Sequence, residues 1–197
     1  APRHHTRAIF RDGTRDDVDY LRMENLGIYG GPGAVGDGVG LQLHDVHQWT
    51  LRNVLIRYCR IGLDLEFAFT GSAERCTINQ NRTGIRVRDT ANNVTLFSQC
   101  NLGFNDVNID FDDDGAGGKN MKFDTVQLEV TSPDQVAVRG APFGVVFENC
   151  YTEGSAHPIV LKGAERCTFR RISFTEGAPV FRLTGCKNVR IAQSFEH

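Results

Sequence analysis

The sequence lacks the features that mark several large classes of protein. Its 22 basic and 24 acidic residues give a net charge of −2, so there is no basic excess to match a nucleic-acid backbone. No apolar run approaches the ~20 residues that a membrane span requires. Helical periodicity is nearly absent, and proline is scarce at 6 residues. These absences argue against a nucleic-acid-binding protein, an α-helical membrane protein and a helical bundle.

Cysteine is present, but its spacing does not favour disulfides. The 6 cysteines form an even set. We expect Cys76 and Cys167 to occupy the same inward position in two coils that are four coils apart. At ~4.8 Å per rung their separation is roughly 19 Å, which is too far for a disulfide. Cys150 is expected to point inward in a different column. We therefore interpret most cysteines as small buried hydrophobic residues and expect the protein to fold in a reducing compartment. The location in which the folded protein acts stays open, and a virion surface and the extracellular space are both compatible with this interpretation.

The sequence does contain a repeat. Three-residue cores of the pattern apolar–any–apolar return about every 24 residues, with last residues 27, 18, 27, 24, 22 and 22 apart. An earlier copy is expected to end at Met23. A period of this size with short strands predicts a solenoid. The cores are Trp49–Leu51, Cys76–Ile78, Val94–Leu96, Met121–Phe123, Val145–Phe147, Cys167–Phe169 and Val189–Ile191.

A second strand follows each core after a glycine or a turn. Alternation along it places every other residue inside the coil, as at Leu63, Leu65, Ile85 and Val87. Asparagine recurs at a corner, where it tolerates the left-handed conformation of a tight bend. These asparagines are Asn25, Asn53 and Asn149.

The pattern predicts an all-β fold, a single right-handed parallel β-helix of about eight coils over residues 18–197. Residues 1–17 do not follow the repeat and are expected to form an N-terminal extension or an end cover. Proteins normally cover the unpaired strand edges at the ends of such a stack. We therefore expect the chain to be part of a longer protein, or oligomer contacts to protect its end.

Two segments, Thr50–Leu63 and Val146–Gly154, resemble right-handed parallel β-helix proteins of the pectate-lyase-like superfamily. The resemblance covers about residues 18–197 and is nearest to bacteriophage tailspikes and glycosidase-related domains. It implies glycan processing or binding, and a tailspike would imply a homotrimer. The sequence has neither the Asp-Pro-His-Asp motif of alginate epimerases nor the Asn-Thr-Asp and Gly-His-Gly motifs of polygalacturonases. It also lacks the Arg-x-Pro-x-Arg of pectate lyases.

The outward residues of the second strand are the candidate site. Carboxylates at Asp64 and Glu66 are expected on one side of Arg86 and Arg88, and further carboxylates on the other side. One predicted column is Gln42, Asp64, Arg86, Asp110, Ala137, Val160 and Arg182. The next is His44, Glu66, Arg88, Asp112, Arg139, Lys162 and Thr184.

Loop lengths predict a groove over the same arginines. Long connections from Leu65 to Ile78 and from Phe111 to Phe123 would flank a short one, and Phe67 and Phe69 in the first would offer faces for sugar rings. A carboxylate pair two rungs apart, ~9.6 Å, is near the ~6.5–9.5 Å of inverting glycosidases. The predicted catalytic residues are therefore Asp64, Glu66, Asp110 and Asp112, with Arg86, Arg88 and Arg139 as binding residues.

Several alternatives stay open. Opposite charges on neighbouring strands pair for ~0.2–1 kcal/mol each, so the same columns could be a structural ladder. Asp112, Asp113 and Asp114 could bind calcium or form a solvated acidic turn, and no other cofactor or metal is expected. His157 beside Glu153 could act as an acid or base and is a candidate substrate-binding residue, or it could be an ordinary loop histidine.

The sequence thus predicts a protein that binds and degrades a polysaccharide, by hydrolysis or by lyase chemistry in which Arg86 or Arg88 neutralises a substrate carboxylate. The alternative is a non-catalytic structural or adhesive module that binds a glycan or a protein partner. Carboxylates wholly satisfied by Arg86, Arg88 and Arg139 would favour the non-catalytic module. An open groove with an unpaired, desolvated carboxylate would favour the enzyme.

Overall fold

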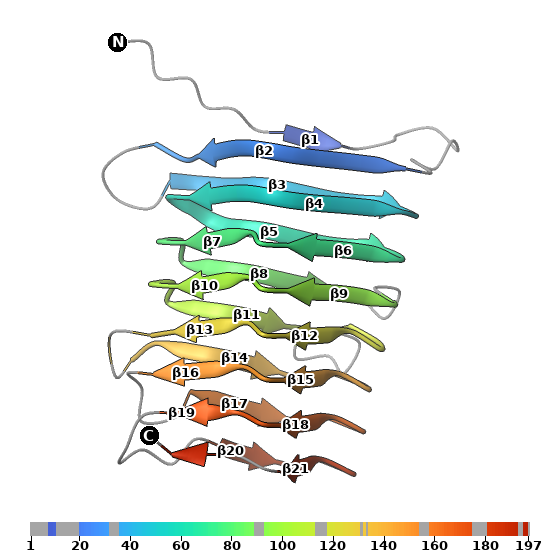
Figure 1. Ribbon diagram of the computed structural model, residues 1–197, viewed down its shortest axis with the longest axis vertical. Coiled ribbons are helices and arrows are strands. Elements are labelled where there is room, and N and C mark those ends of the chain that lie inside the picture. Colours follow the sequence, from blue (N-terminus) through green and yellow to red (C-terminus); the bar gives the residue numbers. More distant parts are fainter. Residues whose placement is uncertain are drawn as a thin grey trace.

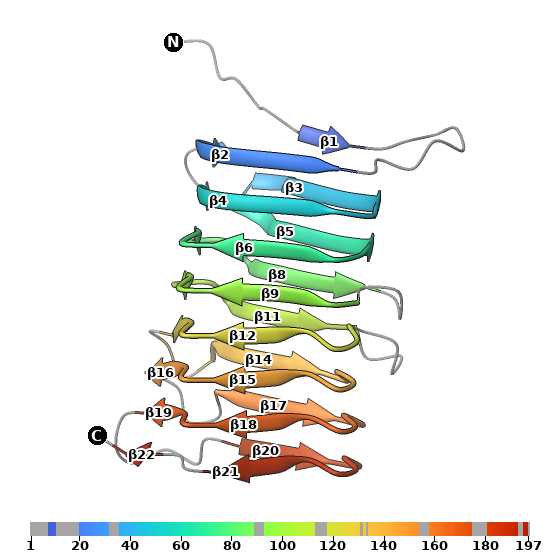
Figure 2. The same ribbon diagram turned by 45° about the vertical axis from the view of Figure 1, so that its right-hand side comes forward.

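The protein is a stack of β-strands along one axis, shown by a computed structural model (Figures 1 and 2). The structure describes residues 8–10, 20–31, 36–88, 93–112, 118–130, 132, 134–153, 158–174, 181–192 and 195–196. Every regular element in these residues is a strand. The described residues therefore contain no helix of the length and apolarity that a membrane crossing needs.

Two sheets of parallel strands make up the stack. The eight-stranded sheet has the order β1-β3-β5-β8-β11-β14-β17-β20. Its strands are β1 Ala8–Phe10, β3 Gly36–Val46, β5 Cys59–Ala68, β8 Thr83–Arg88, β11 Val107–Phe111, β14 Val136–Gly140, β17 Ile159–Lys162 and β20 Phe181–Thr184.

The fourteen-stranded sheet is folded at β4, Trp49–Arg57, which pairs with β2, Leu21–Tyr29. Its first arm continues from β4 through β6 Gly71–Glu74, β9 Thr95–Ser98, β12 Lys122–Asp124, β15 Val146–Glu148, β18 Thr168–Arg170 and β21 Arg190–Ala192. Its second arm continues from β4 through β7 Thr77–Asn79, β10 Asn101–Gly103, β13 Gln127–Glu129, β16 Tyr151–Glu153, β19 Ser173–Phe174 and β22 Phe195–Glu196.

Each turn of chain crosses the first arm, the second arm and the eight-stranded sheet in that order. Six turns, from β4–β5 to β18–β20, lie between the first turn, β2–β3, and an incomplete last turn, β21–β22. The predicted all-β parallel solenoid is confirmed, with slightly fewer complete turns than eight. Residues 8–10, within the predicted N-terminal extension, pair with β3 and add a strand at that end of the eight-stranded sheet.

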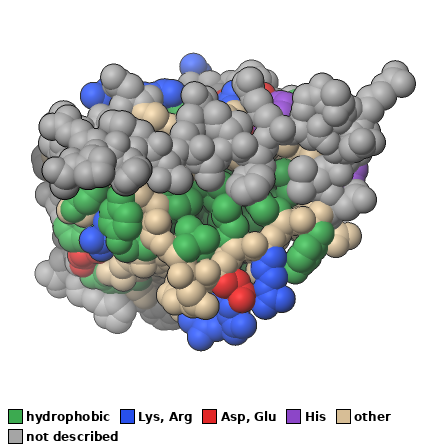
Figure 3. All heavy atoms as spheres, turned by 90° about the horizontal axis from the view of Figure 1, so that it is seen from above, with side chains coloured by type: hydrophobic (Ala, Val, Ile, Leu, Met, Phe, Trp, Pro, Cys, Tyr) green, Lys and Arg blue, Asp and Glu red, His purple; other side chains and the backbone are tan. Residues whose placement is uncertain are grey.

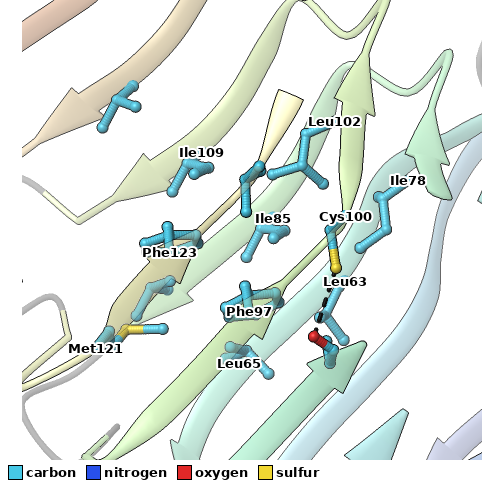
Figure 4. Close-up of a cluster of buried hydrophobic side chains, with 14 of the residues drawn as sticks. Leu63, Leu65, Ile78, Ile85, Phe97, Cys100, Leu102, Ile109, Met121 and Phe123 are labelled. Atoms are coloured by element: carbon cyan, nitrogen blue, oxygen red, sulfur yellow. Dashed lines mark hydrogen bonds between the residues drawn. The ribbon is translucent and has the colours of Figure 1, made fainter. Parts of the chain in front are cut away.

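The core lies inside the coil and is apolar, with a column of aromatic rings. Three neighbouring pairs along a four-ring column stack almost parallel, with ring centroids 4.9, 4.7 and 4.9 Å apart. Figure 4 shows part of this core, where Phe97 and Phe123 from the first arm face Leu65 and Ile85 from the eight-stranded sheet. Seen from the N-terminal end, the described hydrophobic side chains gather at the centre and charged ones at the rim (Figure 3). The stacked rings belong to Phe97, Phe123, Phe147 and Phe169.

The predicted register is wrong in two coils. Val94 and Leu96, expected to be inward, are 59% and 40% exposed, and Phe97 is the inward residue beside Phe123. Ile78, expected opposite Leu51, instead pairs with Ile56 in the second arm, and Ala73 takes the place opposite Leu51.

The physical reason is that a large side chain on one rung fills core space that belongs to the neighbouring rung. The first-arm strand Gly71–Glu74 has no large apolar residue, because Trp49 on the previous rung fills the space. A Cβ on Gly71 would lie 1.9 Å from the Trp49 ring. A pattern search for large apolar residues therefore passes over this strand and takes the next one.

The cysteines are free, and all but the half-buried Cys186 are buried, as expected for small core residues. Their predicted columns are wrong. Cys76, Cys100 and Cys150 sit at the bend before a second-arm strand, and each thiol donates to a carbonyl of an adjacent rung at 3.5–3.6 Å. Cys167 precedes a first-arm strand, so it does not share the slot of Cys76.

The bend between the two arms is built from left-handed residues. Asn25, Asn53 and Asn149 have φ of 54°, 52° and 54°, as the sequence predicts. The Asn53 amide donates to the Asn25 side chain at 2.8 Å. The same bend continues in other turns with Arg75, Gln99, Thr125 and Arg171 at φ of 51–56°. This leaves a row of mostly polar side chains along one corner of the molecule.

Candidate functional site

The predicted carboxylate columns do line the outer face of the eight-stranded sheet. Asp64 pairs in register with Arg86, which pairs with Asp110, and Glu66 pairs with Arg88. The prediction that Asp64 and Asp110 are two rungs apart is confirmed. One register is wrong: Arg139, rather than Ala137, lies opposite Asp110. We call Asp64, Glu66, Arg86, Arg88, Asp110 and Arg139 the ion-pair ladder.

Asp64 is the centre of this ladder. Its side chain is only 1% exposed and accepts two hydrogen bonds from each of two guanidinium groups. Arg86 approaches with Nε at 3.0 Å and Nη2 at 2.8 Å, and Arg88 with the same atoms at 3.1 and 2.8 Å. The hydrogen bond to Asp64, with the charges of Asp64, Asp112 and Asp110, raises the pKa of Arg86 against the opposing effect of burial. Asp64 is therefore held as a fully paired carboxylate.

The other carboxylates of the ladder are also paired. Glu66 Oε2 lies 2.6 Å from Arg88 Nη2 and 3.1 Å from His44 Nδ1. Asp110 receives Nε and Nη2 of Arg139, both at 2.7 Å. Such pairing meets the condition under which this surface is a structural ladder rather than a catalytic groove.

One of the two walls predicted around this ladder is different in the structure, and the other, between Phe111 and Phe123, lies partly outside the described residues. The connection after Leu65 is not a raised loop, because β5 runs on to Ala68 and β6 begins at Gly71. Phe67 and Phe69 are half-buried and make edge contacts with His44 and His47, with ring centroids 6.0 and 5.3 Å apart.

Two further predictions fall mostly on residues outside the described part of the chain. His157 lies outside it, as do Asp113 and Asp114 of the predicted calcium turn. Asp112 is described, and its charge acts on Arg86. Among the described residues, no group of three or more His, Cys, Asp or Glu side chains could hold a metal ion.

A different outer face, that of the second arm, carries a hollow. The hollow measures about 510 Å³ and opens where the first arm bends into the second. Asn101 Nδ2 donates to Gln127 Oε1 at 2.8 Å across neighbouring rungs, so the amides are already oriented. The lining residues are Gln99, Cys100, Asn101, Thr125, Val126, Gln127, Asn149 and Tyr151. We call this surface, together with Glu129 and Glu153, the amide face.

Glu129 and Glu153 form a carboxyl pair at the edge of the hollow. They are register partners on β13 and β16. Gln127 Nε2 donates to Glu129 Oε2 at 3.5 Å, and the Tyr151 hydroxyl donates to Glu153 Oε2. Partial burial, followed by the hydrogen bond and the charge of Glu153, raises the pKa of Glu129. The neighbouring carboxylate therefore favours the protonated form of Glu129.

A glycine makes room for this pair. A Cβ on Gly103, on the rung before Glu129, would lie 2.9 Å from Glu129 Oε2. The Glu129 carboxyl group therefore reaches over Gly103. Exposed aromatic rings stand at the next corner of the coil, where Tyr58 and Phe104 are 37% and 44% exposed.

The sequence interpretation missed this face because it followed two strands per repeat and the coil has three. A signal was nevertheless present. Gln127–Glu129 and Tyr151–Glu153 both end in glutamate, and they lie 24 residues apart, the same interval as Phe123 and Phe147. Equal intervals place the two glutamates on neighbouring rungs.

Comparisons with known proteins leave the family of this chain open. No family model matches the sequence, and no curated protein matches it. Among solved structures, the fold is similar to that of "a putative glycosyl hydrolase" from Parabacteroides merdae, with a TM-score of 0.23 and 7% identity over 81% of each chain. A TM-score this low supports no inference about function, so the function is inferred from the geometry of the chain itself.

Proposed function

We propose that the protein binds a polysaccharide along the amide face. The observation that carries this proposal is the hollow of about 510 Å³, whose eight lining residues include four amide side chains and one tyrosine. Amide groups donate and accept hydrogen bonds at the same time, as sugar hydroxyls do. Aromatic rings such as Tyr151 present apolar surface together with a polar hydroxyl.

The repeat also suits a repeating ligand. Successive rungs are ~4.8 Å apart, close to the length of one pyranose unit. A linear glycan lying along the axis would meet an equivalent side chain at each rung, as Asn101, Gln127 and Tyr151 are placed. The carboxylates of the ion-pair ladder are already paired with guanidinium groups, whereas an amide group that makes one hydrogen bond keeps further donor and acceptor capacity.

Binding is tested by affinity electrophoresis in gels containing bacterial capsular, lipopolysaccharide or plant cell-wall glycans. At least one glycan retards the wild-type protein. Gln127→Ala and Asn101→Ala each weaken that binding by about three- to tenfold, the value of one hydrogen bond. Gln48→Ala, which removes an exposed amide elsewhere, leaves it unchanged. Equal binding by all three variants would remove the amide face as the binding surface.

The carboxyl pair of Glu129 and Glu153 favours a second, more specific function, which is hydrolysis of the bound glycan. Glu129, whose pKa is raised, would in its protonated form give its proton to the glycosidic oxygen, and Glu153 would attack the anomeric carbon to form a covalent intermediate. Water would then release the sugar, with Glu129 taking its proton. The one-rung separation of ~4.8 Å is near the ~5–5.5 Å of retaining enzymes.

Hydrolysis is tested by measuring new reducing ends, with ultraviolet absorbance to detect unsaturated lyase products. Glu129→Gln and Glu153→Gln each reduce the rate by about 10²-fold or more, whereas Glu74→Gln on the first arm does not. The first product keeps its anomeric configuration in an NMR time course. The earlier assignment of Asp64, Glu66, Asp110 and Asp112 as catalytic residues stays a prediction, and Asp64→Asn in the same assay tests it.

A further inference from the structure

The last turns of the solenoid are basic although the chain is not. Residues 164–192 contain six cations and the two acids Glu165 and Glu176, a net of +4, while the whole chain has a net charge of −2. Positive charge is thus concentrated at one end of the molecule, where it attracts anionic ligands. The six cations are Arg166, Arg170, Arg171, Arg182, Lys187 and Arg190.

Two of these arginines share a hollow on the outer face of the first arm. The hollow measures about 330 Å³ and is lined by Thr168, Arg170, Arg190 and Ala192. Thr168 pairs in register with Arg190, and Arg170 with Ala192, so the two guanidinium groups come from diagonal positions on neighbouring rungs. The small side chains of Thr168 and Ala192 occupy the other diagonal and leave the space between the arginines open.

A buried carboxylate fixes one side of this hollow. The Glu148 side chain is 6% exposed and contacts three cations: Lys122 Nζ at 3.0 Å, Arg170 Nη2 at 2.8 Å and Arg171 Nη2. Lys122 Nζ also lies 3.4 Å from Asp124, so three positive charges meet two negative charges and leave an excess of one. Since a guanidinium group has five N–H donors, one contact with Glu148 orients Arg170 without using up its donors.

Arg190 adds a further charge that the neighbouring residues do not neutralise. Within the part of the chain that the structure describes, Arg190 makes no ion pair. By contrast, Lys187 at the nearby corner is paired with Glu165 at 3.0 Å. A site with a fixed and an unneutralised guanidinium group beside a hydroxyl is suited to an oxyanion, because arginine binds carboxylate and sulfate oxygens through paired N–H groups.

We propose that Arg170 and Arg190, with the Thr168 hydroxyl, bind the carboxylate or sulfate group of an acidic polysaccharide. The identity of the polymer rests on the proposed function; the anion site itself does not. The site continues the amide face, because Asn149, which lines that hollow, directly follows Glu148, and its backbone N–H donates to the Arg170 carbonyl at 3.2 Å. A glycan along the bend would reach Arg170 one rung further on and Arg190 on the rung after that.

A nucleic acid is a less suitable ligand for this surface. Proteins that bind single strands place aromatic rings beside the charged groove to stack the bases, and none of the four residues lining this hollow is aromatic. Duplex binding needs a broad basic surface that contacts many phosphates, whereas this site has two arginines in a chain of net charge −2.

The experiment compares three polymers with one backbone: dextran, carboxymethyl dextran and dextran sulfate. Binding is measured at several salt concentrations for the wild type, Arg190→Ala and Arg182→Ala. Arg182 is exposed in the same region but lies on the eight-stranded sheet, so its variant removes the same charge from another face. Circular dichroism and urea unfolding establish that each variant is folded. A duplex and a single-stranded oligonucleotide are included.

The proposal predicts binding of one or both charged dextrans, and the stronger of the two identifies carboxylate or sulfate as the group recognised. Arg190→Ala weakens that binding about tenfold and lowers the salt dependence by about one ionic contact, while Arg182→Ala changes it less than twofold. Equal losses of affinity in Arg190→Ala and Arg182→Ala would mean that the basic end attracts polyanions without a specific site, which would overturn the proposal. Tighter binding of an oligonucleotide than of a charged dextran would also overturn it. Glycan binding that depends on Gln127 but not on Arg190 would overturn the anion site and leave the amide face intact.

Discussion

Buried charge in this protein is concentrated on single carboxylates that hold several cations. Asp64 binds two arginines and Glu148 binds two arginines and a lysine. In each case the acid is buried and the cations are partly exposed, so the charges are desolvated unequally. A buried carboxylate stabilises a fold only while its partners remain, and losing it leaves cations close together.

Asp64→Asn should therefore destabilise the protein. We expect a loss of about 2–3 kcal/mol, below the ~3–5 kcal/mol of fully buried pairs because Arg86 and Arg88 reach solvent. The measurement is urea unfolding beside Asp45→Asn, which removes an exposed carboxylate 3.1 Å from His44 and should cost less than about 1 kcal/mol. Unfolding midpoints that agree between the two variants would show that Asp64 does not hold the ladder together.

Glu129 should make stability depend on pH. Its pKa is raised above the normal 4.5, so the folded state loses the proton at a higher pH than the unfolded state does. The contribution of this group to stability is complete below pH ~4.5 and is lost as the pH rises through the folded pKa. Glu129→Gln removes that loss, so its unfolding midpoint relative to wild type should be higher near pH ~7.5 than near pH ~4. The same difference at both values would contradict the shifted pKa.

The thiols should be inert in the folded protein, with one exception. Burial raises the pKa of Cys150 to about 12 and that of Cys167 to about 11, so neither forms much thiolate near neutral pH. Cys186 is only half-buried. A chromogenic disulfide reagent should label about one thiol quickly and the others only after unfolding. Rapid labelling of several thiols in the native state would be inconsistent with the buried columns.

At the scale of the strands, the residue that points into the core on each rung depends on how much core space the neighbouring rung already fills. Trp49 projects over Gly71, and the next rungs are filled by the stacked phenylalanines. The alternating strands of the eight-stranded sheet were predictable, because each carries strict apolar alternation. The rungs at Gly71–Glu74 and Thr95–Ser98 were not, because a glycine or a threonine occupies a slot whose volume comes from a neighbouring turn.

Gly71→Ala tests this exchange of volume. The added Cβ would meet the Trp49 ring, which is packed among core residues and cannot move freely, so we expect a loss of about 1–3 kcal/mol. Gly38→Ala is the matched control, because nothing lies within 4 Å of a Cβ at that position. Thermal unfolding of both variants gives the comparison. A Gly71→Ala variant as stable as Gly38→Ala would mean that Trp49 does not fill the rung.

Strand alternation also determines how much of the candidate site could be predicted from the sequence. The alternation of Asp64, Arg86 and Asp110 showed the ion-pair ladder, because neighbouring charges in register follow from strand alternation alone. It could not show that Asp64 is buried beneath both arginines, which depends on side-chain conformation. The amide face lay in a third strand of only three residues per turn, too short for alternation to reveal it.

At the scale of the whole molecule, each turn contacts only the turns before and after it. Among the described strands, those of central turns have two neighbours, whereas β20 and β21 each pair with one, and their residues Leu183 and Ile191 are 40% and 44% exposed. Stability in such a stack is roughly a sum of nearest-neighbour terms. The homotrimer implied by the tailspike resemblance stays a prediction.

Hydrogen exchange should therefore be graded along the axis. Backbone amides of β5, β8 and β11 should exchange slowest, and those of β20 and β21 fastest, because opening the end breaks one interface and opening the centre breaks two. Mass spectrometry of peptides from each turn gives the profile. Protection at β20 and β21 equal to that of the centre would contradict a stability set by the number of neighbouring turns.

The most direct test of the central claim compares the two faces on one ligand. Binding and cleavage of the retained glycan are measured for the wild type, Gln127→Ala, Glu129→Gln and Asp64→Asn under conditions where all four are folded. The amide face predicts weaker binding for Gln127→Ala, loss of cleavage for Glu129→Gln and wild-type behaviour for Asp64→Asn. Loss of binding or cleavage in Asp64→Asn alone would contradict this account and return the site to the ion-pair ladder.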